Sequence, residues 1–144
     1  MKKPVALLFF AFFFYACKEK ERFVEADIVL NKWSKASETL NYEDYKKCEA
    51  YPKEKTDFDE IYKNYYFSQI TVTKIEDLNE RDTKTDFEGN SFIKRNVFFE
   101  CIEFNRQTQK ENQFVKGEVF FIKFVNCARE KEGWLMANRT IIRF

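Results

Sequence analysis

The chain has 144 residues, enough for one folded domain of ordinary size and too few for two. Its 25 basic and 24 acidic side chains nearly cancel, so it lacks the positive field that gathers nucleic-acid phosphates. It contains no histidine and no Cys-x-x-Cys spacing, which disfavours a zinc site and a thioredoxin-like redox role. We therefore expect no metal, no cofactor and no nucleic-acid partner.

The amino-terminal segment has the layout of a secretory signal peptide. Two lysines follow Met1, and the residues from Pro4 to Ala16 carry no charge. A bilayer-spanning helix needs about 20 apolar residues, whereas here charge returns immediately after Cys17. The segment is therefore predicted to be removed rather than to stay as an anchor. This divides the chain into a signal peptide (1–16), a charged tether (17–22) and a single domain (23–144).

The boundary Phe14-Tyr15-Ala16-Cys17 resembles the lipobox of bacterial lipoproteins, with Phe14 where leucine is usual and Tyr15 where smaller residues are common. The resemblance implies that Cys17 carries a diacylglycerol and an acylated amino terminus, with palmitate-type chains in the membrane. Several acyl chains anchor a protein stably where one chain binds only marginally. The implied location is the bacterial cell envelope, at the periplasmic or surface face of the outer membrane. The charged run after Cys17 resembles an export tag and is equally typical of a solvated linker.

Helices are predicted next. Apolar residues from Phe23 to Leu40 recur mostly every three or four positions, as on one face of an amphipathic helix. Asn41 and Asp44 resemble a capping box, which predicts a second helix that begins at Tyr42 and ends near Tyr51.

A short third helix is predicted after Pro52. Thr56 or Asp57 offers its cap, and Phe58, Ile61, Tyr62 and Tyr65 continue the helical spacing.

The remainder of the chain has the character of β-structure. Runs of branched and aromatic residues predict four strands, and the short polar links between the last three predict antiparallel neighbours in a meander. Both faces of these strands carry apolar groups, so bulges are expected, with Gly117 as one site. The acidic stretch from Glu76 to Glu88 is predicted to be a solvated loop rather than a calcium site. The predicted strands are 68–75, 92–105, 114–127 and 134–144.

Three thiols remain if Cys17 is lipidated. A hairpin turn centred near Lys110 and Glu111 would place Cys101 opposite Phe120, too far from Cys127 for a disulfide. Buried free thiols are expected, although a bond from Cys48 to either of the other two stays open.

The fold class expected is α+β, with amino-terminal helices packed on a strongly curved antiparallel sheet of about four strands. This order of elements resembles the nuclear-transport-factor-like, cystatin-like superfamily of cone-shaped domains. Tyr65-Tyr66-Phe67 before Ile70-Thr71-Val72 is similar to its junction of helix and first strand, and Gly133-Trp134 to its closing strand. The resemblance implies a cavity between the first helix and the concave face of the sheet.

Five aromatic residues are candidates to line such a cavity, because aromatic rings combine a large apolar area with a polar handle. Aromatic residues at helical spacing are also typical of an ordinary core. The candidate pocket residues are Trp33, Tyr62, Tyr66, Phe99 and Trp134.

Two glutamates on one predicted strand, Glu100 and Glu103, could supply acid–base chemistry. Strand residues three apart point to opposite faces unless a bulge lies between them, which disfavours a cooperating pair. No residue can be assigned as catalytic, and we expect the protein not to be an enzyme. An isomerase- or hydrolase-like enzyme that uses one glutamate with Tyr62 is the alternative.

These observations favour a membrane-anchored lipoprotein that acts as a non-enzymatic module and binds a small apolar ligand or a protein partner. An immunity or inhibitor lipoprotein that blocks a toxin is a further alternative. It would leave an exposed apolar patch on the sheet.

Overall fold

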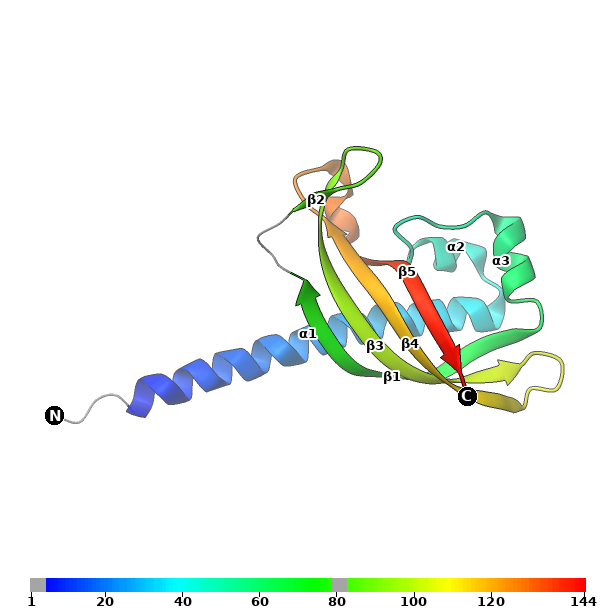
Figure 1. The fold of residues 1–144 in the computed structure, drawn as a ribbon, viewed down its shortest axis with the longest axis horizontal. Coiled ribbons are helices and arrows are strands. Elements are labelled where there is room, and N and C mark those ends of the chain that lie inside the picture. The colour runs from blue at the N-terminus through cyan, green and yellow to red at the C-terminus, as the bar shows by residue number, and fades with distance from the viewer. Residues whose placement is uncertain (1–4, 79–82) are drawn as a thin grey trace.

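The computed structural model describes residues 5–78 and 83–144, and their side chains from residue 14 onward. One long helix, two short helices and a 3₁₀ turn pack on an open antiparallel sheet, so the predicted α+β class is confirmed (Figure 1). The helical elements are α1 (Val5–Thr39), α2 (Tyr42–Lys46), α3 (Lys55–Ile61) and η1 (Ala128–Glu132). The strands are β1 (Tyr65–Leu78), β2 (Lys84–Thr85), β3 (Ser91–Asn105), β4 (Glu111–Phe124) and β5 (Trp134–Arg143).

Helix α1 lies against the concave side of the sheet and buries one face. Ala26, Leu30, Trp33 and Ala36 recur at helical spacing and are at most 1 % exposed. The helix begins earlier than the expected start at Phe23, and residues 17–22 belong to it. Lysine, glutamate and arginine are good helix formers, so this charged segment continues the helix.

The predicted signal peptide falls largely on residues whose side chains lie outside the described part of the chain. Among the described residues, no helix is both long and apolar enough to cross a bilayer.

Arg106 holds the end of α1 in place. Its guanidinium donates to the carbonyl oxygens of Glu38 at 2.7 Å and Ser37 at 2.5 Å, and its Nε donates to that of Tyr62 at 3.0 Å. The last carbonyls of a helix have no partner within the helix, so this clamp satisfies groups that would otherwise be costly to bury. Leu40 then turns the chain with a φ of 53°.

The predicted cap of α2 is confirmed, because the Asn41 side chain accepts a hydrogen bond from the Asp44 amide at 3.1 Å. The predicted end near Tyr51 is wrong. The segment 48–50 leaves the helix to pair with β5, where the Ala50 amide donates to the Met136 carbonyl at 2.8 Å.

The predicted cap of α3 at Thr56 or Asp57 is also wrong. This helix begins at Lys55, and Glu54 at its N-cap position makes no side-chain cap.

The sheet has the order β1-β3-β4-β5, which confirms the antiparallel meander, and β2 adds a short pairing with β3. The predicted bulge at Gly117 is wrong, since Gly117 pairs in register with Phe99. Glycine is needed there because the Phe99 ring lies over it, and an added Cβ would lie 2.6 Å from ring Cε2. Register shifts fall instead between Val119 and Phe121, beside Glu103, and at two places in β1, between Ser68 and Thr71 and between Val72 and Lys74.

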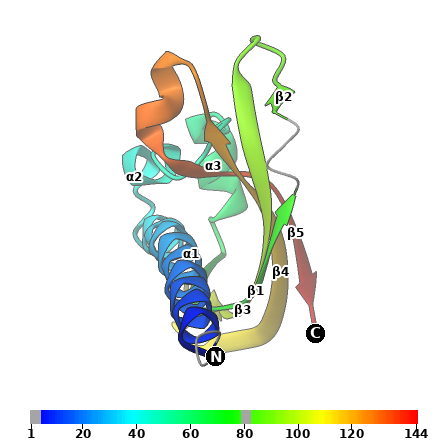
Figure 2. The same cartoon turned by 90° about the vertical axis from the view of Figure 1, so that its left-hand side faces the viewer.

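Alternation along the strands divides the sheet into two faces. Val97, Phe99, Cys101, Val119 and Phe121 point to the concave side, where they form the main core with α1. Figure 2 shows α1 on one side of the curved sheet, with the opposite side open. The alternate residues of β3 and β4 therefore form a convex face.

All four cysteines are free. Cys101 lies opposite Val115 rather than Phe120, because the hairpin turns closer to Thr108 than to Lys110 and Glu111. Burial raises the pKa of the Cys48 thiol to about 11 and that of Cys101 to about 12. These two thiols are therefore protonated members of the core.

Candidate functional site

Three of the five candidate pocket residues meet in the core. Trp33 Nε1 donates a hydrogen bond to the Tyr62 hydroxyl at 2.9 Å, and the rings of Trp33 and Phe99 meet edge to face with centroids 6.1 Å apart. Each of these three side chains is at most 4 % exposed. Their rings fill the space between α1 and the sheet around Trp33.

The other two candidates lie apart from this group. Tyr66 stacks on Phe104 with centroids 5.3 Å apart, and its hydroxyl donates to Gln109. Trp134 lies beneath the guanidinium of Arg95, whose Cζ is 3.9 Å from the ring centroid. The structure therefore does not bring the five residues together around one space.

A buried ion pair that the sequence did not predict joins Glu49 to Arg139. Glu49 is 4 % exposed, and burial raises its carboxyl pKa to about 7 against the opposing effect of Arg139. The Arg139 guanidinium also lies over the Trp33 ring, with Cζ 5.0 Å from the centroid. Burial raises the pKa of the neighbouring Tyr62 hydroxyl to about 12.

This cluster is suited to support the core rather than to do chemistry. The Glu49 carboxylate is held by a guanidinium, and the Tyr62 hydroxyl already accepts a hydrogen bond from Trp33. The two charged partners lie 90 residues apart in sequence. In the sequence, the one sign of this ion pair is a charged residue, Arg139, at an inward-facing position of a strand.

Glu103 and Glu100 lie on opposite faces of β3, as strand geometry predicted. Glu103 is 3 % exposed and accepts hydrogen bonds from Arg143, Asn112 and Gln113 at 2.6 to 2.9 Å. Burial opposes ionisation of Glu103, but these three donors outweigh it and lower its pKa. An acid so stabilised in its charged form is a poor general acid.

Glu100 points to the convex face and pairs with Lys116 at 3.3 Å. Across the described ranges 14–78 and 83–144, neither glutamate hydrogen-bonds a tyrosine hydroxyl. The geometry that the enzymatic alternative requires is absent from this part of the chain.

The acidic stretch after Glu76 is only partly described. Within the described part, no group of three potential metal ligands converges. Asp86 instead accepts hydrogen bonds from the amides of Glu88 and Asn90 and from the Tyr51 hydroxyl. Asp77 pairs with Arg95 on the next strand.

The convex face of the sheet carries several exposed apolar side chains. Apolar side chains that protrude from β3, β4 and β5 stand next to one another on it, and no described helix covers it (Figure 2). Phe114 is 39 %, Ile142 54 % and Phe144 70 % exposed. We call this surface the interaction face; its apolar members are Phe98, Ile102, Phe104, Phe114, Phe120, Ile142 and Phe144.

Lysine ammonium groups lie above several rings of this face. Lys94 Nζ is 3.6 Å from the centroid of Phe120, and Lys116 Nζ is 5.9 Å from that of Phe114. Lys116 is also paired with Glu100 on the same face. The face is therefore apolar with balanced charge, which suits an apolar protein surface better than a polyanion.

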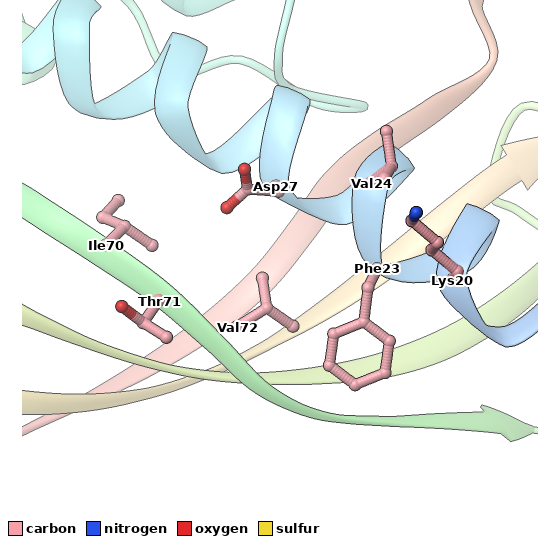
Figure 3. Close-up of a pocket in the computed structure, with 7 residues that line it drawn as sticks. All are labelled: Lys20, Phe23, Val24, Asp27, Ile70, Thr71 and Val72. Carbon is pink, nitrogen blue, oxygen red and sulfur yellow. The ribbon is translucent and has the colours of Figure 1, made fainter.

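Two surface pockets lie on the helix side of the molecule. A pocket of about 330 Å³ opens between α1 and β1, where Phe23 extends toward the strand and Val72 toward the helix (Figure 3). A more polar groove of about 620 Å³ includes Lys32 of α1 and Glu49. None of the five candidate aromatic residues lines either pocket.

No protein-family model and no curated protein matches the sequence. Among solved structures, the intermembrane-space region of the chloroplast protein ARC6 aligns with 85 % of this chain and 97 % of its own, at 9 % identity. Its TM-score of 0.35 is too low to support an argument about fold or function. The α+β architecture itself is compatible with the resemblance to cystatin-like domains.

Proposed function

We propose that the protein is a lipid-anchored lipoprotein of the bacterial cell envelope, with a cystatin-like domain that binds a protein partner through its interaction face. The observation that carries the proposal is the uncovered convex sheet with adjoining exposed Phe114, Ile142 and Phe144. Exposed apolar patches rimmed by polar residues mark protein interaction sites in soluble domains. The domain is not an enzyme in this proposal.

A protein partner is favoured over a small apolar ligand because packed aromatic rings fill the core. Trp33 packs on both Phe67 and Phe99 at the position where a cone-shaped domain would hold a ligand. Each is at most 1 % exposed, so a ligand there would have to displace packed rings. The interaction face needs no such rearrangement.

The partner's surface should match this face in its chemistry. Apolar side chains are needed to cover the rings, and no large excess of either charge is needed, since Lys116 and Glu100 already pair. An inhibitor lipoprotein that blocks a toxin would use the same surface, and it is one form of this proposal.

The test is photo-crosslinking in cells. A photoreactive benzoyl-phenylalanine would replace Phe98 or Phe114, with exposed Lys131 of η1 on the helix side as the control position. We expect one discrete adduct with a second protein from both sheet positions and none from position 131. The double variant Phe114→Lys with Ile142→Lys should abolish the adduct formed from position 98. Adducts only with the protein itself, or equal adducts from all three positions, would refute the proposal.

The anchor is tested separately. The mature protein should begin at Cys17 and carry the mass of a diacylglycerol and an acyl chain. Cys17→Ser should leave the signal uncut or release the protein from the membrane fraction. A variant that stays in the membrane with an unchanged mature mass would contradict lipidation.

A further inference from the structure

Helix α1 has an exposed apolar strip, one member of which, Val24, stands at the pocket between α1 and β1 and extends away from that strand (Figure 3). Val24 is 49 % and Ile28 is 58 % exposed, and the two lie one turn apart on the same helix face. The buried residues Ala26 and Leu30 lie on the opposite face. This strip therefore contributes nothing to the core.

The proposed lipid attachment site lies in line with this strip. Cys17 is part of the same continuous helix and is exposed. Val24 follows it by two turns, which places Cys17, Val24 and Ile28 along one side of α1 over roughly 16 Å. The helix leaves no flexible linker between the lipid and the domain.

Farther along the same side, the polar groove continues the surface from Lys32. Its positive members are Lys32, Lys46, Lys47 and Arg129, and its acidic members are Glu43, Glu49 and Glu132. The negative charge of Glu49 is balanced by its buried ion pair with Arg139. Lys46 pairs with Glu43, Lys47 with Asp44 and Arg129 with Glu132, which leaves Lys32 as the groove cation without an ion pair among the described residues.

We propose that the outward side of α1 lies on the bilayer that holds the lipid of Cys17. Val24 and Ile28 contact the boundary between head groups and acyl chains, and the groove at Lys32 faces phosphates of anionic lipids. The inference rests on the lipid anchor proposed above. It turns the interaction face away from the membrane, because α1 and that face lie on opposite sides of the sheet (Figure 2).

Because the protein is anchored covalently, the small contact of Val24 and Ile28 with the bilayer is enough to orient it. Two aliphatic side chains would not hold a free protein on a membrane. A tethered domain instead meets the bilayer at a high effective concentration, so weak contacts can select one orientation. The contribution of Val24 and Ile28 is to orientation, and the acyl chains provide retention.

Orientation must therefore be measured directly. The lipidated protein would be reconstituted in phosphatidylcholine vesicles with or without phosphatidylglycerol, with benzoyl-phenylalanine in place of Ile28 or, as control, Phe114. Lipid adducts would be counted by mass spectrometry after illumination. We expect at least about tenfold more lipid adduct from position 28 than from position 114, as for a helix face buried at the interface.

Two further variants separate the contributions. In the protein with the probe at position 28, Val24→Glu should lower the lipid adduct in both kinds of vesicle. Lys32→Glu should lower it only in vesicles that contain phosphatidylglycerol. Equal lipid adducts from positions 28 and 114 in a protein of confirmed lipidated mass would overturn the orientation alone. A protein without the lipid mass would instead contradict the anchor itself.

Discussion

Replacing Gly117 with alanine is expected to destabilise the domain by about 1–3 kcal/mol, the usual cost of overpacking a tight core. The added Cβ would lie 2.6 Å from Cε2 of the Phe99 ring and closer still to Cζ, so the ring has to move. Phe99 is 1 % exposed and packs against Trp33, so the displacement is transmitted into the core. The relief that alanine normally brings to a strand glycine is smaller, at about 0.5–1 kcal/mol.

The assay is urea unfolding of the mature chain with Cys17→Ser, followed by tryptophan fluorescence, for wild type, Gly117→Ala, Phe99→Leu and the double variant. Phe99→Leu alone should cost about 1–3 kcal/mol through the cavity it leaves. In the double variant the new methyl group occupies space freed by the ring, so its cost should be below the sum of the two single costs. An unchanged stability of Gly117→Ala, or strict additivity in the double variant, would refute the packing argument.

Burial raises the Glu49 carboxyl pKa from 4.5 to about 7, so the native state holds this proton more tightly than the unfolded chain. The stabilisation of the native state by protonated Glu49 is complete below pH 4.5 and is lost as the pH rises through 7. Urea titrations at a series of pH values should therefore show wild type losing up to about 3 kcal/mol relative to Glu49→Gln across that window. Arg106→Met leaves the carbonyls of Ser37, Glu38 and Tyr62 without this donor. The free energy of unfolding should fall by about 2–4 kcal/mol, and amide hydrogen exchange at the end of α1 should become faster. Unchanged exchange at that end would contradict the role given to Arg106. Iodoacetamide should modify Cys127 in the native protein well before Cys48 or Cys101, which are buried and have raised thiol pKa values; uniform labelling by mass spectrometry would argue against that burial.

Local patterns were sufficient to predict most elements of the fold. The spacing of Ala26, Leu30 and Trp33 predicts the face that α1 buries, and Asn41 with Asp44 predicts the start of α2. Signals of this kind depend on residues three or four positions apart, which is why they can be read without the partner elements.

Register and side-chain pairing were harder to predict. The hairpin between β3 and β4 turns closer to its first strand than expected, so the partner of Cys101 is Val115 and not Phe120. The end of α2 is decided by the pairing of Ala50 with Met136, which is a contact between distant segments. No local pattern encodes either outcome.

The sequence by itself determined the order and type of the main elements, although not β2 or η1, and the alternation that divides the strands into two faces. Only the tertiary structure decided which of those faces α1 covers. That choice leaves Phe114 and Ile142 exposed, and the folding of distant segments onto one another brings Glu49 to Arg139. The physical reason is that amphipathic periodicity is a property of neighbours along the chain. Contact between distant segments depends instead on bulges, turn positions and packing that the whole domain sets together.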